Sequence, residues 1–360
     1  MELRDDLGIA VIGGGLAGAV LAWRLTRMGH PVTVLTGGAT VTRDATAVSG
    51  GLLRAFETDP VTARAAALSL AELRADAGLR ELAGYREFGS SYLLPSGSTA
   101  ARIRPVLDLV DELLPGAAEL VDATELKTFR GLPSDTLAVV EPAAGCLSPA
   151  RLRTGLLAAV EAAGGTVRAE TVTALAPDGE LRTVAGGAER YRAVVVAAGP
   201  WTPRLLRSWR LPDQGLRAKQ IQYTIGTTDR LPPGMGAFVD ETSGLYGRPD
   251  GPHRMLLGLP TDRWDVDPAA LTPLPELAAQ VAACAAERLG LADWPGPDAR
   301  TATAADCWAA PGGTGGLLLR RLPADAPLFT FTGGTGGAAK TVLANSRDAA
   351  AALVEACPPS

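Results

Sequence analysis

Three glycines near the start of the chain carry the first chemistry that the sequence indicates. Gly13, Gly15 and Gly18 form a Gly-x-Gly-x-x-Gly pattern after an apolar run at residues 9–12, and a helical segment and a second apolar run at 32–35 follow. This order predicts a strand, a helix and a strand. Gly13 then makes the tight turn, Gly15 lets the backbone approach a pyrophosphate, and Gly18 packs helix on strand. The pattern predicts a dinucleotide-binding unit.

One expected feature of such a unit is missing. Its second strand usually ends in Asp or Glu, which binds the ribose hydroxyl groups, whereas here it ends in Thr36. Two alternatives stay open: Thr36 makes a weaker hydroxyl contact, or the ribose is held elsewhere. A glycine-rich turn in some other α/β protein is the alternative for the whole motif. It is disfavoured because strand, helix and strand all fall where the motif needs them.

Composition excludes several classes of function. The net charge of −5 and pI near 5.3 predict no nucleic-acid or membrane partner. The first residues lack the basic-then-apolar order of a signal peptide, so we expect a cytoplasmic protein. The cysteines include no C-x-x-C pair, which argues against a zinc site or a disulfide framework, and no metal site is predicted. They are Cys146, Cys284, Cys307 and Cys357.

Lysine is rare, so each lysine is a candidate for a specific role. The sequence has 31 arginines and three lysines, Lys127, Lys219 and Lys340. Lys340 follows a second glycine-rich turn, residues 333–337, and precedes a closing helical segment. Arg54 lies at the end of a small-residue stretch, residues 40–54, that predicts a loop.

The elements that must position these residues suit two domains. At 360 residues and 47% hydrophobic content, the chain can build two cores. Periodicity predicts helices near 60–83, 99–114, 149–163, 274–289 and 338–355, a buried strand within 191–201, and antiparallel strands over 218–259 with a turn at 248–251. We expect an α/β fold with a discontinuous Rossmann-like domain, residues 1–85, 146–215 and 301–360, interrupted by an antiparallel-sheet α+β domain, residues 86–145 and 216–300.

With these pieces placed, the chain resembles the D-amino-acid oxidase superfamily of FAD-dependent oxidoreductases over nearly its whole length. The resemblance rests on the first glycine motif, the run Val194–Trp201, the Arg-Pro-Asp-Gly segment at 248–251 and the turn before Lys340. It implies FAD bound across the parallel sheet. The residues it implies for cofactor binding are Gly13, Gly15, Leu16, Ala17, Gly18, Thr36, Ser49, Gly50, Val172, Gly199, Trp201, Cys307, Gly333, Gly334, Thr335, Gly336, Gly337 and Lys340.

Within the superfamily, the chain looks most like the monomeric sarcosine oxidase and glycine oxidase branch. The resemblance implies that Arg54 and Lys340 grip the substrate carboxylate through charge-assisted hydrogen bonds. The alternatives are that Arg54 binds FAD phosphate and Lys340 caps a helix. The resemblance also places Cys307 where that branch attaches FAD through a thioether, with a free buried cysteine as the alternative. Tyr246 and Tyr223 are further candidates for the active-site wall, with ordinary sheet packing as the alternative.

Departures from the branch concern oxygen and pocket size. Where the branch has a lysine near flavin N5 that helps dioxygen accept electrons, this chain has Leu256, and it is open whether His253 or Arg254 points at the flavin. Pro260 and Ala309 replace larger side chains around the substrate, which predicts a larger pocket.

The leading hypothesis is an FAD-dependent oxidase of an amino acid or N-substituted glycine, a secondary amine, in a biosynthetic pathway. Hydride passes from the substrate α-carbon to flavin N5, water hydrolyses the imine, and dioxygen is the expected electron acceptor. Two alternatives stay open: a dehydrogenase of the same family that passes electrons to another acceptor, and a flavin-binding subunit without turnover. The sequence leaves the substrate and the oligomeric state undefined.

Overall fold

The computed structural model describes residues 8–38, 44–309, 316–324 and 327–357. The expected first unit is present as β1 (Ile9–Ile12), α1 (Leu16–Arg27) and β2 (Val32–Leu35). These strands lie inside a six-stranded sheet of order β19-β20-β13-β1-β2-β9, parallel except for its edge strand β19. The other strands are β19 (Leu318–Arg321), β20 (Leu328–Thr332), β13 (Ala193–Val196) and β9 (Thr166–Arg168).

Both faces of this sheet are covered, so its central strands β1 and β13 are apolar throughout. Ile9 and Val11 of β1 point into a core shared with helix α1, whereas Ala10 and Ile12 point into a second core. The first core also holds α6 (Pro149–Ala162) and α9 (Ala338–Ala356). The second holds α7 (Thr202–Ser208) and a small sheet of β10 (Val172–Leu175), β11 (Glu180–Thr183) and β12 (Ala188–Arg190).

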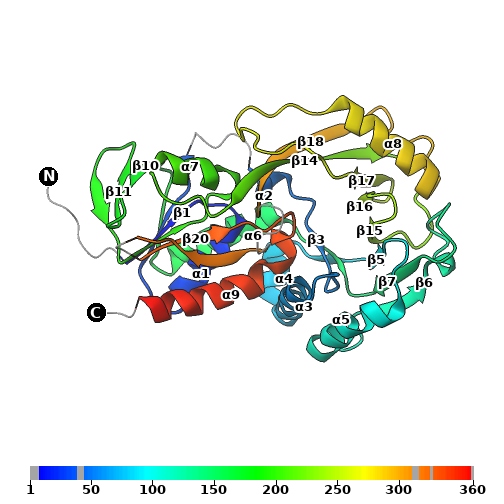
Figure 1. Cartoon of the computed structure of the whole chain (residues 1–360), viewed down its shortest axis with the longest axis horizontal. Coiled ribbons are helices and arrows are strands. Elements are labelled where there is room, and N and C mark those ends of the chain that lie inside the picture. Colours follow the sequence, from blue (N-terminus) through cyan, green and yellow to red (C-terminus); the bar gives the residue numbers. More distant parts are fainter. Residues whose placement is uncertain (1–7, 39–43, 310–315, 325–326, 358–360) are drawn as a thin grey trace.

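An eight-stranded sheet forms the other half, in the order β18-β14-β17-β16-β15-β5-β7-β6. Its longest strands, β14 (Leu216–Thr227) and β18 (Arg300–Ala309), pair antiparallel and reach from the parallel-sheet half into this half (Figure 1). Helices α5 (Ala100–Leu113) and α8 (Pro275–Leu289) belong to this half. The other strands are β17 (Arg254–Gly258), β16 (Tyr246–Gly251), β15 (Ala237–Asp240), β5 (Ser90–Leu93), β7 (Leu137–Glu141) and β6 (Glu119–Asp122).

Two helices and several short elements connect the two halves. The predicted helix at 60–83 is two helices, α3 (Pro60–Ala75) and α4 (Ala77–Ala83), because Asp76 is extended and its side chain caps α4 at Leu79 N. The stretch predicted as a loop contains α2 (Ala45–Val48) and β3 (Leu52–Leu53). Strand β3 pairs with β8 (Gly145–Cys146), which also pairs with β4 (Arg86–Glu87).

Two strands lie differently from what the sequence suggests. The sequence predicts that residues 301–360 belong to the cofactor domain, and within that range β18 pairs along β14 in the antiparallel sheet. The predicted turn at 248–251 lies inside β16, because the strand continues through an irregular register at Pro249 and Gly251 before the chain reverses into β17.

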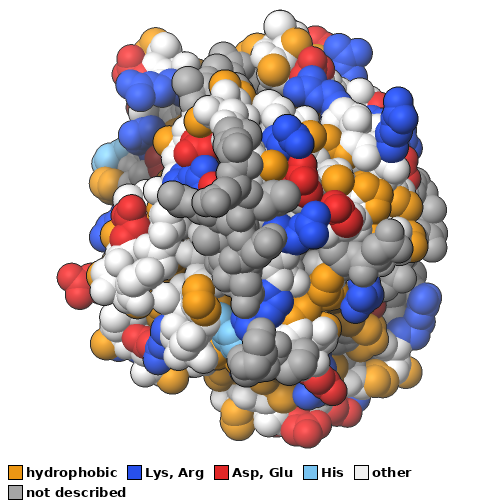
Figure 2. Space-filling model, turned by 90° about the vertical axis from the view of Figure 1, so that its left-hand side faces the viewer, with side chains coloured by type: hydrophobic (Ala, Val, Ile, Leu, Met, Phe, Trp, Pro, Cys, Tyr) orange, Lys and Arg blue, Asp and Glu red, His pale blue; other side chains and the backbone are white. Residues whose placement is uncertain are grey.

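The surface agrees with the modest net charge. On the face shown in Figure 2, Lys and Arg side chains are interspersed with Asp and Glu. Within the described part of the chain, no helix is long and apolar enough to span a membrane.

Candidate functional site

A cavity of about 1170 Å³ runs from the carboxyl ends of β1 and β2 to the antiparallel sheet. In open α/β sheets this edge is where ligands bind. The cavity is bounded by the start of α1, by the segment around Gly50, by the second glycine turn and by strands β14 and β16. One hollow therefore joins the two halves that the sequence assigned to cofactor and substrate.

The first glycine motif has the geometry that the sequence predicts. Gly13 has φ +121°, and a Cβ there would lie 2.3 Å from the carbonyl oxygen of Ala197. A Cβ on Gly18 would lie 2.0 Å from the carbonyl oxygen of Gly13, so this glycine allows close packing of helix and strand. Helix α1 begins at the cavity with no acidic residue in its first turn. Its N-terminus therefore suits a phosphate.

Most residues predicted for the site line this one cavity. The exceptions are Gly18, Cys307 and Gly333. Gly18 lets helix α1 pack closely on the glycine turn, and Cys307 and Gly333 do not line the cavity. The predicted residues on the wall are Gly13, Gly15, Leu16, Ala17, Thr36, Ser49, Gly50, Arg54, Val172, Gly199, Trp201, Tyr246, Gly334, Thr335, Gly336, Gly337 and Lys340.

Arg54 and Lys340 meet at a third residue that the sequence reasoning missed. Arg54 Nη2 lies 2.7 Å from Oε1 of Glu57, and Lys340 Nζ contacts the same oxygen. Burial raises the pKa of Glu57, but the charges of Arg54 and Lys340 outweigh burial and hold this pKa below its ordinary value. Burial, with the charge of Arg54, lowers the pKa of Lys340 against the attraction of Glu57. Within this group, two cations therefore share one carboxylate oxygen.

Aromatic and acidic groups hold the guanidinium of Arg54 and the backbone that follows it. Its guanidinium lies 4.9 Å from the ring centre of Tyr92, and its Nε donates to the carbonyl oxygen of Phe56 at 3.2 Å. Oε1 of Glu141 accepts hydrogen bonds from the N–H groups of Ala55 and Phe56, at 2.6 and 2.9 Å. Burial raises the pKa of Glu141 to about 7, against these bonds and the charge of Arg54. Glu141 therefore fixes the backbone that presents Arg54.

Strand β18 places alternate residues on the cavity, next to a continuous segment of β14. Lys219 pairs with Asp306, and both line the cavity together with Trp308. Cys307 pairs with Ala218 and Ala309 with Leu216, which puts them on the opposite face because side chains alternate along a strand. Cys307 is 1% exposed, and burial raises the pKa of its thiol to about 12. The structure thus gives no support to the predicted thioether.

The same alternation changes the expected pocket size. Pro260 lines the cavity, as predicted, but Ala309 does not, and Trp308 occupies the wall instead. Only one of the two predicted enlargements is present. Tyr246 lines the cavity and donates from its hydroxyl to the carbonyl oxygen of Gln222 at 3.2 Å. Burial raises the pKa of Tyr246 above its ordinary value, so it is neutral and is no general base.

Lys219 is a second cavity residue that the sequence reasoning did not assign. Its ammonium lies 4.6 Å from the ring centre of Trp264 and 4.3 Å from that of Trp308. These two rings stand at 88° to each other. Lys219 is 8% exposed, and within the described ranges no carboxylate forms an ion pair with it. Burial lowers its pKa against the charge of Asp262. The scarcity of lysine was the signal in the sequence.

The residues considered as replacements for the missing lysine do not reach the cavity. Leu256 pairs with Arg248 and Ile225, and it approaches the position of Gly50. His253 bonds the carbonyl oxygen of Asp229 at 3.1 Å and is exposed, and Arg254 is exposed beside Asp250. Neither His253 nor Arg254 places a cation in the cavity. Lys219, from the different strand β14, does.

The donor set fits FAD rather than a metal. A glycine-lined wall and a helix N-terminus without acidic groups suit a pyrophosphate, and the cavity continues past them to the antiparallel sheet. Among the described residues, no group of three or more His, Cys, Asp or Glu side chains could hold a metal ion.

These features fit a protein that binds a dinucleotide between a parallel and an antiparallel sheet, and the family comparison identifies its class. The model of the DAO family, described as FAD dependent oxidoreductase, matches residues 8–351. The chain therefore belongs to the DAO family of FAD-dependent oxidoreductases, and FAD is its cofactor. This confirms the resemblance and the fold class expected from the sequence.

Solved structures give the same fold. L-proline dehydrogenase from P. horikoshii matches with a TM-score of 0.78 and 18% identity, over 99% of this chain and 96% of that one. NikD, "an unusual amino acid oxidase essential for nikkomycin biosynthesis", matches with 0.75 and 22%, over 98% and 95%. Glycine oxidase from Bacillus cereus ATCC 14579 matches with 0.76 and 17%, over 98% and 96%. No curated protein matches by sequence. At these identities, the neighbours show the fold alone.

Proposed function

We propose that this FAD-dependent oxidoreductase oxidises the carbon next to the nitrogen of an amino acid or N-substituted glycine. The observation that carries the proposal is the convergence of Arg54 and Lys340 on one carboxylate oxygen, that of Glu57, in the wall of the cofactor cavity. The arrangement shows that the two cations can share one carboxylate. Because their charge exceeds that of Glu57, they can also attract the carboxylate of a ligand.

The chain supplies orientation, and the cofactor supplies the redox chemistry. Bound FAD would supply the two-electron acceptor for a hydride from the substrate α-carbon. The nitrogen lone pair of the substrate would form the C=N bond, and water would hydrolyse the imine to a carbonyl compound and an amine. A carboxylate anchored at Arg54 and Lys340 limits which C–H bond can face the cofactor. Tyr246 is neutral and donates to Gln222, so it serves as a wall rather than a base. The buried surroundings favour the neutral amine, which this step requires.

Dioxygen is the electron acceptor that we propose, with Lys219 as the cation that assists it. As oxygen takes up electrons it becomes negative, and a buried ammonium in the same cavity stabilises that charge. The second candidate is a dehydrogenase that passes electrons to another acceptor. It is favoured by Leu256, which places an aliphatic side chain where the oxidase branch has its lysine.

Anaerobic bleaching of the yellow protein tests the substrate class. The panel pairs sarcosine, proline, pipecolate and N-alkyl glycines with the corresponding amines that lack the carboxylate. We expect bleaching by at least one acid and by none of the matched amines. Equal bleaching by an acid and its decarboxylated partner would contradict the carboxylate role. Adding oxygen or a dye to the bleached protein then separates the oxidase from the dehydrogenase, because only an oxidase recovers its colour rapidly with oxygen alone.

A further inference from the structure

The position that usually binds the ribose of the adenosine half is occupied by Thr36. Its hydroxyl makes a long contact, 3.4 Å, to the carbonyl oxygen of Arg168, and its Cγ2 lies 2.6 Å from where a Cβ on Gly14 would stand. The methyl group therefore faces the glycine motif, and the hydroxyl points at the neighbouring strand. Strand β2 supplies no acid to the cavity at its end.

The neighbouring strand does supply one. Strand β9 pairs parallel with β2, Leu35 opposite Arg168, so both strands end at the same edge. Glu170, two residues beyond β9, lies on the cavity wall beside Thr36 and Gly37. Backbone hydrogen bonds join the two chain segments. Thr36 N donates to the carbonyl oxygen of Arg168, and Gly37 N donates to that of Glu170, both at 3.0 Å. Thr171 Oγ1 donates to the carbonyl oxygen of Gly37 at 2.8 Å.

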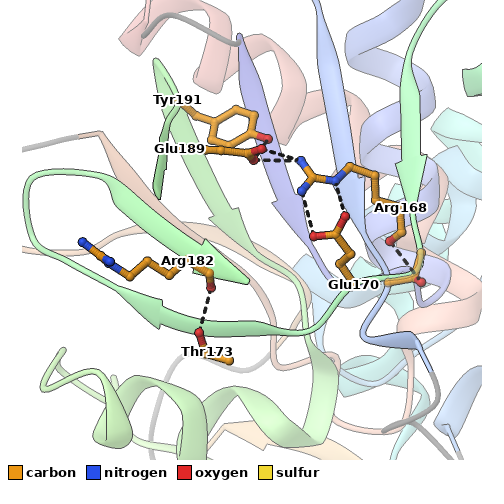
Figure 3. A network of polar contacts seen from close by, with 7 residues as sticks. Arg168, Glu170, Thr173, Arg182, Glu189 and Tyr191 are labelled. Atoms are coloured by element: carbon orange, nitrogen blue, oxygen red, sulfur yellow. Dashed lines mark hydrogen bonds and ion pairs between the residues drawn. The ribbon is translucent and has the colours of Figure 1, made fainter. Parts of the chain in front are cut away.

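A network of charges fixes the Glu170 carboxylate (Figure 3). Arg168 donates to both of its oxygens, from Nε at 2.9 Å and from Nη2 at 2.7 Å. Nη1 of Arg168 donates to Glu189, whose Oε2 also accepts from the hydroxyl of Tyr191 at 2.8 Å. The hydrogen bonds from Arg168 hold the pKa of Glu170 below its ordinary value, so the group is ionised at neutral pH.

This carboxylate keeps free acceptor capacity. A carboxylate has about four lone-pair sites. Arg168 occupies one on each oxygen of Glu170, and the side chain of Thr183 also hydrogen-bonds to this carboxylate, which leaves part of the capacity open. The side chain remains 26% exposed. An ionised, oriented acceptor with remaining capacity suits a hydroxyl donor, and the sugar of a dinucleotide presents such donors at this edge of the sheet.

We propose that Glu170 binds the ribose hydroxyl groups of the adenosine half of FAD, in place of the acid that usually ends β2. Arg168 and Glu189 are then positioning residues that aim the carboxylate. The role is independent of the substrate, since it rests on the FAD requirement of the family and on this sheet edge.

Other acids on the cavity wall serve as comparisons. Asp44 is engaged elsewhere, because it caps α2 at Ala47 N and pairs with Arg153 at 2.9 Å. Glu161 lies on α6, lines the same cavity and is exposed. Glu161→Gln is therefore a matched control for Glu170→Gln, since both changes remove one charge from the wall.

The test measures how flavin-free protein binds two nucleotides, ADP and 2′,3′-dideoxy-ADP, by competition with FAD fluorescence quenching. A Cys307→Ser background prevents covalent attachment from interfering. We expect the parent to prefer ADP by about tenfold or more, and Glu170→Gln to lose most of that preference while Glu161→Gln keeps it. Glu170→Asp, which keeps the charge but shortens the reach, is expected to lose part of it.

Several results would overturn the proposal. A parent that binds both nucleotides equally shows that no ribose hydroxyl is recognised, and this outcome needs no variant. Equal weakening of both nucleotides by Glu170→Gln shows that Glu170 only supports Arg168. Loss of the preference in Glu161→Gln and its retention in Glu170→Gln would assign the ribose to α6. Melting temperatures of the flavin-free variants verify that each remains folded.

Discussion

Arg54 and Lys340 contact the same oxygen atom, Oε1 of Glu57, although they come from opposite ends of the chain. Arg54 follows β3, and Lys340 lies in the first turn of α9. Packing of α9 against β3 and α3, the elements on either side of Arg54, brings them together. The site that we assign to the substrate carboxylate therefore exists before a substrate arrives, and Glu57 keeps its two cations from repelling each other.

Removing either cation should weaken substrate binding while FAD stays bound. Arg54→Ala and Lys340→Ala are each expected to cost about 2–4 kcal/mol in affinity for the carboxylate substrate, the usual scale for losing one partner of a buried charged pair. Anaerobic titration of the flavin spectrum measures this. Lys127→Ala, which changes an exposed lysine, is the control. If both cavity variants lose flavin, the two residues serve the cofactor instead. If both keep flavin and bind the substrate with the affinity of the parent, they do not hold its carboxylate.

FAD should be released when the protein is precipitated with acid. Cys307 lies on the face of β18 that points away from the cavity, and a thiol with a pKa of about 12 supplies almost no thiolate for attachment. The measurement is the flavin absorbance of the supernatant and of the pellet. A yellow pellet from the parent and a colourless one from Cys307→Ser would show that the thioether forms after all.

The sequence predicted those parts of the site that lie within local motifs. The glycine turn at Gly13, the Lys340 turn and the loop that carries Arg54 depend on neighbours in the sequence, and the resemblance supplied their roles. Strand register decided the rest. Whether Cys307 or Trp308 faces the cavity depends on pairing with β14, which no local pattern determines.

The sequence analysis missed the acidic residues of the site, again because their positions depend on how strands pair and helices pack. Glu141 becomes a partner of the Arg54 segment only when β7 packs beside it, and Glu57, three residues after Arg54, meets Lys340 only when α9 does. Glu170 lies at the sheet edge where we propose that the ribose binds only because β9 is the neighbour of β2. Their identity as acids was visible in the sequence, but their position was not.

Glu141 should make stability fall as pH rises from about 4.5 to 7. Its pKa is 4.5 as the ordinary value and about 7 in the folded protein, so the folded state binds the proton more tightly across this range. The stabilisation is complete below pH 4.5 and is lost as pH passes 7, about 3 kcal/mol in all by proton linkage. Glu141→Gln should lack this slope, and exposed Glu125→Gln should keep it. Denaturant unfolding at pH 4.5, 6 and 8 measures the difference, and parallel curves for parent and Glu141→Gln would contradict the assignment.

Lys219 should affect the reaction of the reduced protein with oxygen much more than the reduction of the protein by substrate. Its ammonium is buried in the cofactor cavity between Trp264 and Trp308, so it can stabilise negative charge that develops on dioxygen. If the ammonium lies roughly 10 Å from the reacting oxygen and the effective dielectric constant is about 20, its charge stabilises a unit negative charge on that oxygen by about 1.7 kcal/mol. This corresponds to somewhat more than tenfold in rate.

Lys219→Met is therefore expected to slow reoxidation of the reduced protein by oxygen about tenfold. Anaerobic reduction by substrate should change less than about threefold, since Arg54 and Lys340 still hold the carboxylate. Stopped-flow absorbance separates the two half-reactions, and Lys127→Met is the matched control on the surface. Should Lys219→Met recover its colour with oxygen at the parent rate, the cation has no part in that step. With Leu256 in place of a lysine, the dehydrogenase alternative would then be favoured.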